Sequence, residues 1–223
     1  MHETVVTVEG RFEHHHPAER GTVVLGVGFE GAERDDVVRR TTALHARVVE
    51  QVRAMHDPDA GPVTWWSSDR TSVWSHRPWS SSGKQLAPVH HAAVRVEAKF
   101  SDLARLAQWV EQVATLDGVT VQGVTWTLTE VTRRRLTVDA RQRAVADAVD
   151  RATVYAGALG LQDVRAVAVA EPGMLGDVTG PVAVVESTGS LRAAAAPADG
   201  PGLELKPEDL TVTAVVHARF AAS

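Results

Sequence analysis

Histidines are the side chains of this chain with the clearest capacity for metal chemistry, and five of them stand in two runs. His14, His15 and His16 are consecutive, and His90 and His91 form a second run. Imidazole nitrogens bind Zn²⁺, Cu²⁺ or Ni²⁺, but a stable zinc site needs three or four ligands that converge on the ion. Such a site would require His90 or His91 to fold against the triplet, or neighbouring subunits to pool their histidines. We expect the triplet to lie in an exposed connection instead, and we predict no metal site.

Tryptophans form the second group of candidate functional side chains. Trp65, Trp66, Trp74 and Trp79 lie close together in a stretch rich in Ser, His and Arg. Aromatic side chains in such surroundings form ligand grooves and subunit contacts, whereas the alternative is a local core beneath a loop. We favour an interface or groove, because Trp74 and Trp79 fall where the pattern turns polar. Trp109 and Trp126 are predicted to belong to the core.

No catalytic constellation is visible. The serines between Ser67 and Ser82 lie in neither a Gly-x-Ser-x-Gly nor a Ser-x-x-Lys pattern, and the chain has no cysteine. Gly26, Gly28 and Gly31 fit the spacing of a dinucleotide-binding motif, but no clear βαβ unit follows, and Glu30 places a negative charge where phosphate would lie. We therefore predict no catalytic residue and no cofactor, and expect that the protein is not an enzyme.

Composition limits the partners. The formal net charge is −5 and 44% of the 223 residues are hydrophobic, as in an ordinary soluble globular protein. A general nucleic-acid binder needs a basic face, and the run Arg133 to Arg135 is more simply the solvated start of a helix. No stretch approaches the roughly 20 apolar residues that span a bilayer. Because no signal-peptide pattern follows Met1, we expect a cytoplasmic protein.

Hydrophobic periodicity predicts strands alternating with three helices. Asp35 and Asp36 favour the start of the first helix, and Ser101-Asp102 is the predicted cap of the second. A polar connection over residues 13–17 predicts a hairpin between the first two strands. The predicted strands are 4–9, 22–29, 63–75, 91–100, 119–131, 164–170, 182–185 and 210–220, and the predicted helices are 35–56, 103–114 and 137–159.

Alanine recurs every fourth residue along the third predicted helix. The series runs through Ala140, Ala144, Ala148, Ala152 and Ala156. Four-residue spacing places these methyl groups in one slightly drifting row. We predict that this alanine ridge is buried against another element.

The mixture of helices and hairpin-like strand pairs predicts an α+β fold, with antiparallel or mixed sheets and three main helices packed on them. Residues 1–223 are expected to form one domain, or two intertwined subdomains. Residues 171–209 are rich in Gly, Pro, Ala and Ser, and we expect them to be mostly irregular.

The order and spacing of these segments resemble the SIMPL family, named for a mammalian kinase-associated signalling protein, whose bacterial members include periplasmic immunogenic and oxidative-stress proteins. The resemblance comprises a Val-x-Val-x-Gly strand, a Val-Val-Leu-Gly-Val strand, a strand–helix–strand unit, an alanine-spaced helix and a final strand. The corresponding residues are Val6, Val8 and Gly10, then 23–27, 89–128, 156–160 and 203–210. The chain departs from the family in two ways. The bacterial relatives are mostly exported, whereas this sequence shows no export signal. The segment from Trp65 to Trp79 is also unusually aromatic.

The resemblance implies an α+β protomer with no agreed enzymatic activity, and, for bacterial members, large ring- or channel-like homo-oligomers. We therefore expect a non-enzymatic, self-assembling scaffold or binding module, whose partner is a second copy of itself. The alternative is a protein that binds a metal or small ligand, or a hydrolase, using the histidine and tryptophan clusters.

Overall fold

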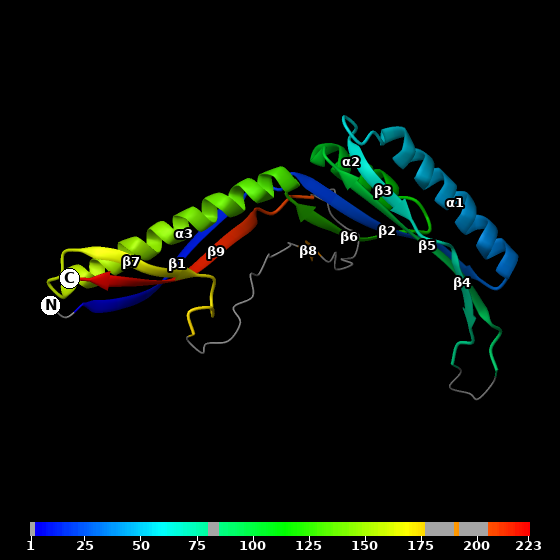
Figure 1. The fold of residues 1–223 in the computed structure, drawn as a ribbon. Coiled ribbons are helices and arrows are strands. Elements are labelled where there is room, and N and C mark those ends of the chain that lie inside the picture. Colours follow the sequence, from blue (N-terminus) through cyan, green and yellow to red (C-terminus); the bar gives the residue numbers. More distant parts are fainter. Residues whose placement is uncertain (1–2, 80–84, 177–189, 192–204) are drawn as a thin grey trace. The chain divides into compact units, whose positions relative to one another are not determined.

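The described chain consists of two antiparallel sheets with three helices (Figure 1). The computed structural model describes residues 3–79, 85–176, 190–191 and 205–223. The chain divides into two compact units, and the predicted α+β class is confirmed. Unit 1 comprises Met1–Pro17, Leu128–Ser187 and Asp209–Ser223, and unit 2 comprises Ala18–Thr127 and Thr188–Glu208.

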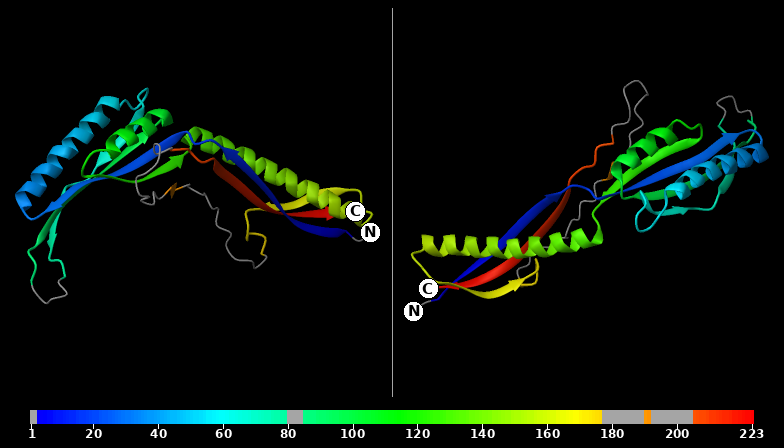
Figure 2. Two further views of the ribbon diagram at one scale, coloured as in Figure 1. Left: turned by 180° about the vertical axis from the view of Figure 1, so that it is seen from behind. Right: turned by 90° about the horizontal axis from the view of Figure 1, so that it is seen from above.

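Unit 1 is a three-stranded sheet with one long helix along it (Figure 2). Its strands are β1 (Thr4–His16), β7 (Val164–Ala170) and β9 (Leu210–Ala222), in the order β1-β9-β7, and its helix is α3 (Glu130–Ala158). β1 pairs with β9 along its whole length, from Thr4 opposite Ala222 to His16 opposite Leu210. The predicted hairpin between the first two strands is therefore wrong. Residues 13–16 continue β1 because β9 is long enough to pair with them.

The alanine ridge is buried, as predicted. Ala140, Ala144, Ala148 and Ala152 have no exposed surface, and the ridge packs on β1 and β9 beside Val6, Val8 and Phe220. Gly10 completes this contact, because a Cβ there would collide with the Ala144 carbonyl oxygen and lie 2.7 Å from the Ala148 Cβ. Only methyl groups and a glycine let the helix approach this closely.

α3 begins seven residues earlier than its alanine spacing indicated, so the predicted start at Thr137 is wrong. The Thr129 hydroxyl caps the helix by accepting a hydrogen bond from the Thr132 amide at 3.3 Å. Glu130 lies in the first turn and pairs with Arg133 and Arg134, which lowers the pKa of its carboxyl. The arginine run thus forms the solvated start of the helix, as the sequence indicated.

Unit 2 is a sheet of six strands with two helices. The chain order is β2 (Arg20–Gly31), α1 (Arg34–Met55), β3 (Val63–Ser68), β4 (Ser72–His76), β5 (Val89–Phe100), α2 (Leu103–Ala114), β6 (Val119–Thr127) and β8 (Ser190–Leu191). The strand order is β3-β5-β2-β6-β8, and β4 also pairs with β5. The single strand predicted over 63–75 is therefore two strands, and the strand predicted to end at residue 131 ends at Thr127.

The core of unit 2 lies between one face of this sheet and the two helices. β2 supplies Val23, Leu25 and Val27, all fully buried, and β5 supplies alternate residues from Ala92 to Phe100. Trp109 and Trp126 are buried as predicted, and the Trp109 Nε1 donates to Gln51 Oε1 at 2.9 Å, which joins α2 to α1. Asp102 caps α2 by accepting from the Arg105 amide at 2.9 Å, which confirms the predicted cap.

The segment over 171–209 falls largely outside the described residues, and the strand predicted at 182–185 lies entirely outside them. Within the described part, residues 171–176 form turns and Ser190–Leu191 pairs with β6. Among the helices in the described ranges, none is long and apolar enough to cross a membrane.

We predict that Ala148→Leu lowers the free energy of unfolding by about 1–3 kcal/mol, because no space remains beneath the ridge. Ala146→Leu is the matched control, since Ala146 is exposed on the same helix and a surface change of this kind costs less than about 0.5 kcal/mol. Denaturation should be followed by far-UV circular dichroism. Tryptophan fluorescence would not report on unit 1, because all six tryptophans lie in unit 2. Equal stabilities of the two variants would contradict the packing described here.

Candidate functional site

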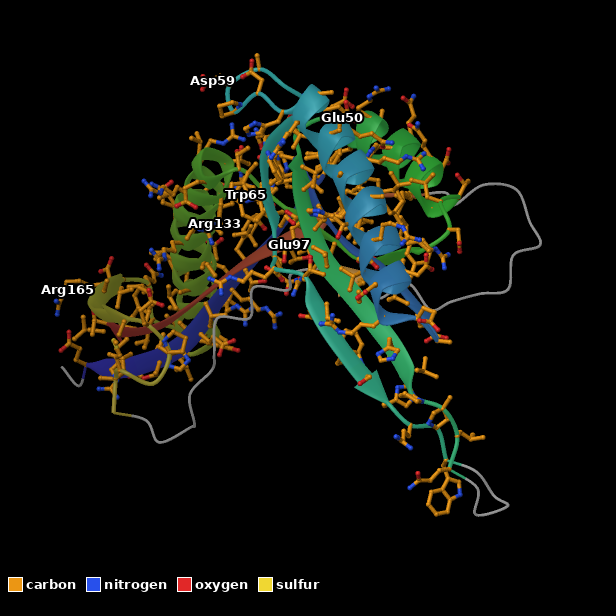
Figure 3. All side chains as sticks on the ribbon, turned by 90° about the vertical axis from the view of Figure 1, so that its right-hand side faces the viewer. Glu50, Asp59, Trp65, Glu97, Arg133 and Arg165 are labelled. Carbon is orange, nitrogen blue, oxygen red and sulfur yellow. The ribbon has the colours of Figure 1, made fainter. Side chains whose placement is uncertain are left out.

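The face of the unit 2 sheet that points away from α1 and α2 carries the polar and aromatic side chains with chemical potential. Strand alternation places Trp65, Glu97 and Lys99 on this open face, whereas Trp66 and Ala98 point toward the helices. Figure 3 shows Trp65 and Glu97 on one side of the sheet and Glu50 of α1 on the other. The Lys99 Nζ lies 6.0 Å from the centroid of the Trp65 ring.

A compact cluster of aromatic rings lies on the open face where β4 pairs with β5. Trp74 is opposite His91 in the register, and their rings are 5.1 Å apart with planes 7° from parallel. His91 Nε2 lies 2.9 Å from Nδ1 of His76. On its other side, His91 Nδ1 lies 3.4 Å from the carboxylate of Glu30, which is its neighbour on β2. We call Glu30, Trp74, His76 and His91 the histidine cluster.

Only two members of the cluster are among the candidate site residues predicted from the sequence. His91 and Trp74 were identified, but His76 and Glu30 were missed as partners of His91. Strand alternation places His91 on the open face and His90 on the opposite one. What the sequence did not reveal is the register of β4, because residues 63–75 read as one continuous strand.

The other predicted site residues do not join this cluster. His14, His15 and His16 lie in β1 of unit 1 rather than in a connection, so His14 and His16 share one face and His15 points to the other. The His15 Nδ1 lies 3.1 Å from the Thr211 hydroxyl, and the His16 Nδ1 lies 2.8 Å from the Pro17 carbonyl oxygen. The strand geometry therefore prevents the three rings from converging.

The four neighbouring tryptophans are not a local core. Trp65 and Trp74 are about half exposed and Trp79 is 91% exposed. Trp66 is half-buried on the helix side, where the guanidinium of Arg53 lies 5.4 Å from its ring centroid. These side chains are thus divided between the two faces of the sheet and the chain beyond β4.

A histidine–serine pair that the sequence did not suggest lies between α1 and β3. The His45 Nε2 is 2.7 Å from the Ser68 hydroxyl, beside a shallow groove lined by His45, Val49, Glu50 and Arg53. Burial of the ring lowers the pKa of His45, and the charge of Arg53 adds to this effect. The imidazole is therefore neutral at pH 7.

This pair is better suited to joining the two elements than to catalysis. The Ser68 hydroxyl also lies 3.4 Å from the Asp69 carbonyl oxygen, and the tautomer of His45 decides which of the two partners accepts its proton. The contact with His45 holds the end of β3 against α1. The described contacts of His45 also include no carboxylate that would orient its ring, as a catalytic triad requires.

The shifted pKa of His45 predicts how stability depends on pH. Because the folded protein holds the ring neutral, the unfolded chain takes up a proton near pH 6.5 that the folded chain resists. The free energy of unfolding is therefore unaffected by the titration of His45 above pH 6.5 and decreases as the pH falls below that value. We expect His45→Gln, whose amide does not titrate, to show a smaller loss of melting temperature between pH 7 and pH 5. An unchanged pH profile would show that His45 titrates normally.

Comparison with known proteins gives one family match. The model described as "SIMPL: Protein of unknown function (DUF541)" matches residues 6–220, which includes all three helices and both sheets. A comparison with curated proteins finds no match.

Proposed function

The chain belongs to the SIMPL (DUF541) family, and we propose that it is a non-enzymatic protein that assembles with copies of itself through unit 1, as a scaffold or binding module. The observation that carries this proposal is the open edge of β7. Support also comes from the candidate site, where the described contacts of His45 beside Ser68 include no carboxylate.

Exposed apolar side chains are concentrated in unit 1. Within the described residues, most large hydrophobic side chains with high exposure belong to this unit, whereas those of unit 2 are Trp65, Trp74, Trp79 and Leu86. Apolar side chains on the surface can be buried when another protein binds. The members in unit 1 are Val5, Val131, Val138, Val149, Val154, Tyr155, Leu159, Val167, Val169 and Met174.

β7 is an edge strand whose outer side has no partner strand among the described residues. It pairs on one side with β9, and its register shifts between Ala166 and Ala168, so that Val167 has no partner there. Val167 is 56% exposed and Val169 is 50% exposed. An open edge of this kind presents backbone amides and carbonyls that another strand can pair with.

β1, the opposite edge of the same sheet, is protected. The Asp147 carboxylate on α3 accepts a hydrogen bond from the backbone amide of Arg11 at 2.8 Å. Asp147 also pairs with Arg151 at 2.9 Å, and the Arg11 amide is the main reason why the pKa of its carboxyl is lowered. β1 further carries Glu9, Arg11 and Glu13, and charged side chains are a common protection against edge pairing. The open edge is therefore β7.

The composition of β7 suits pairing with a second copy of the same strand. Its sequence from Val164 to Ala170 contains one charge, at Arg165. In an antiparallel pairing centred on Val167, Arg165 would face Val169 of the other copy, so no like charges would be opposed. Such a contact is self-complementary, as a twofold interface must be.

We predict that the untagged protein has a mass in solution above the 23.9 kDa of one chain. We also predict that Val167→Lys shifts the population toward the mass of a single chain. A lysine at the open edge opposes pairing because it introduces a charge that faces its own copy. The matched control is Ala146→Lys, at an exposed position of α3 outside this set of apolar side chains, which should leave the mass unchanged. Multi-angle light scattering over a concentration series measures both.

Two results would contradict the proposal. A wild-type protein that remains at the mass of one chain at every concentration would exclude self-assembly. An assembly that survives Val167→Lys but dissociates with Ala146→Lys would place the interface on α3 instead of β7.

A further inference from the structure

The histidine cluster has an arrangement that goes beyond self-assembly. We propose that His76 and His91 bind a divalent transition-metal ion, with Cu²⁺ preferred, on the open face of the unit 2 sheet. Glu30 would orient His91 without touching the ion. This ligand pair differs from the set considered in the sequence, in which His90 or His91 would fold against the triplet. Here His76 joins His91, and the triplet takes no part.

The spacing of the two nitrogens supports this assignment. His91 Nε2 and His76 Nδ1 are 2.9 Å apart. At adjacent corners of a square-planar Cu²⁺ site, two nitrogens each about 2.0 Å from the ion are separated by about 2.8 Å, with both lone pairs directed at the ion. The hydrogen bond between the two rings therefore opens, and His76 moves, when the ion binds. The ring of His76 is on an exposed residue, so a rotation of this side chain can turn its lone pair toward the ion.

Glu30 determines which nitrogen of His91 is free to bind. Its carboxylate lies 3.4 Å from His91 Nδ1 and therefore favours the proton on that nitrogen. The lone pair of His91 is then on Nε2, which faces His76. Carboxylates that hold the remote nitrogen of a metal-binding histidine are the common outer partners of such sites. The tautomers follow from these contacts.

Binding needs no net loss of protons. Without metal, His76 carries its proton on Nδ1 and donates it to Nε2 of His91. With metal, the neutral His76 ring carries its proton on Nε2 instead, and both facing nitrogens offer lone pairs. Trp74 stacks on His91 and restricts the orientation of that ring. Less conformational entropy is therefore lost when the ion binds.

The site leaves positions on the ion for other ligands. No group of three or more His, Cys, Asp or Glu residues suited to a metal occurs among the described residues, so water or a small ligand would complete the coordination. Two imidazoles with open positions favour Cu²⁺, because the order of affinity for divalent metals peaks there. The site is consequently exchangeable rather than structural.

The test is titration of the full-length, untagged and metal-free protein with CuCl₂, followed by calorimetry and by tryptophan fluorescence. We expect one equivalent of Cu²⁺ to bind per chain and to quench Trp74, which stacks on a ligand. His76→Ala and His91→Ala should each weaken binding by at least about tenfold, and Glu30→Gln by about 10–100-fold. Trp74→Phe should remove most of the quenching while it retains the heat of binding.

His90→Ala is the matched control, since His90 lies on the same strand but on the opposite face, and His15→Ala controls for the triplet. Both should bind Cu²⁺ like the wild type. His76 is exposed, so its variant tests the proposal even where a change at His91 disturbs folding, which circular dichroism would reveal. The proposal is overturned if His76→Ala binds with wild-type affinity, or if His90→Ala or His15→Ala removes the bound equivalent.

Discussion

The close approach of α3 to β1 and β9 is the contact on which unit 1 depends. Helix and sheet meet through alanine methyl groups and Gly10, where any Cβ would collide with the backbone of α3. A contact of this kind is tight, but it buries little apolar area per residue, and the hydrophobic contribution scales with that area. Unit 1 therefore has a thin core, supplemented by Val6, Val8, Val216 and Phe220. The same helix leaves its larger apolar side chains, such as Tyr155 and Leu159, on the surface.

Unit 2 is organised in the opposite way. Its core consists of branched and aromatic side chains between the sheet and two helices, with Phe100 and Trp109 in contact at 5.5 Å between ring centroids. Because both helices pack on one face, the other face remains available for polar and aromatic groups, and the histidine cluster is built there from three adjacent strands. The two units thus differ in what they expose: unit 1 presents apolar side chains and an open strand edge, and unit 2 presents side chains that can bind ligands.

The sequence predicts local features well, because they depend on periodicity. The alternation from His91 to Phe100, the buried alanines and the cap at Asp102 all follow from spacing alone. Partners distant in the sequence were not predictable, since alternation indicates a strand without indicating its neighbour. β1 was consequently assigned to β2, although it pairs with β9. The same limitation hid the contact of His76 with His91, which depends on the register of β4, and that of His45 with Ser68, which depends on the packing of α1 against β3.

The pairing of β1 with β9 also has a consequence for synthesis on the ribosome. β1 comprises Thr4–His16 and is made well before its partner, which comprises Leu210–Ala222. At about 5–20 residues per second, the nascent strand waits roughly 10–40 s for that partner. Strands β2 to β6 emerge within this interval and have their neighbours close in the sequence, so they can fold first. Throughout this time the apolar face of β1, with Val6 and Val8, lacks its native cover. A strand translated much later therefore decides whether β1 is ever protected.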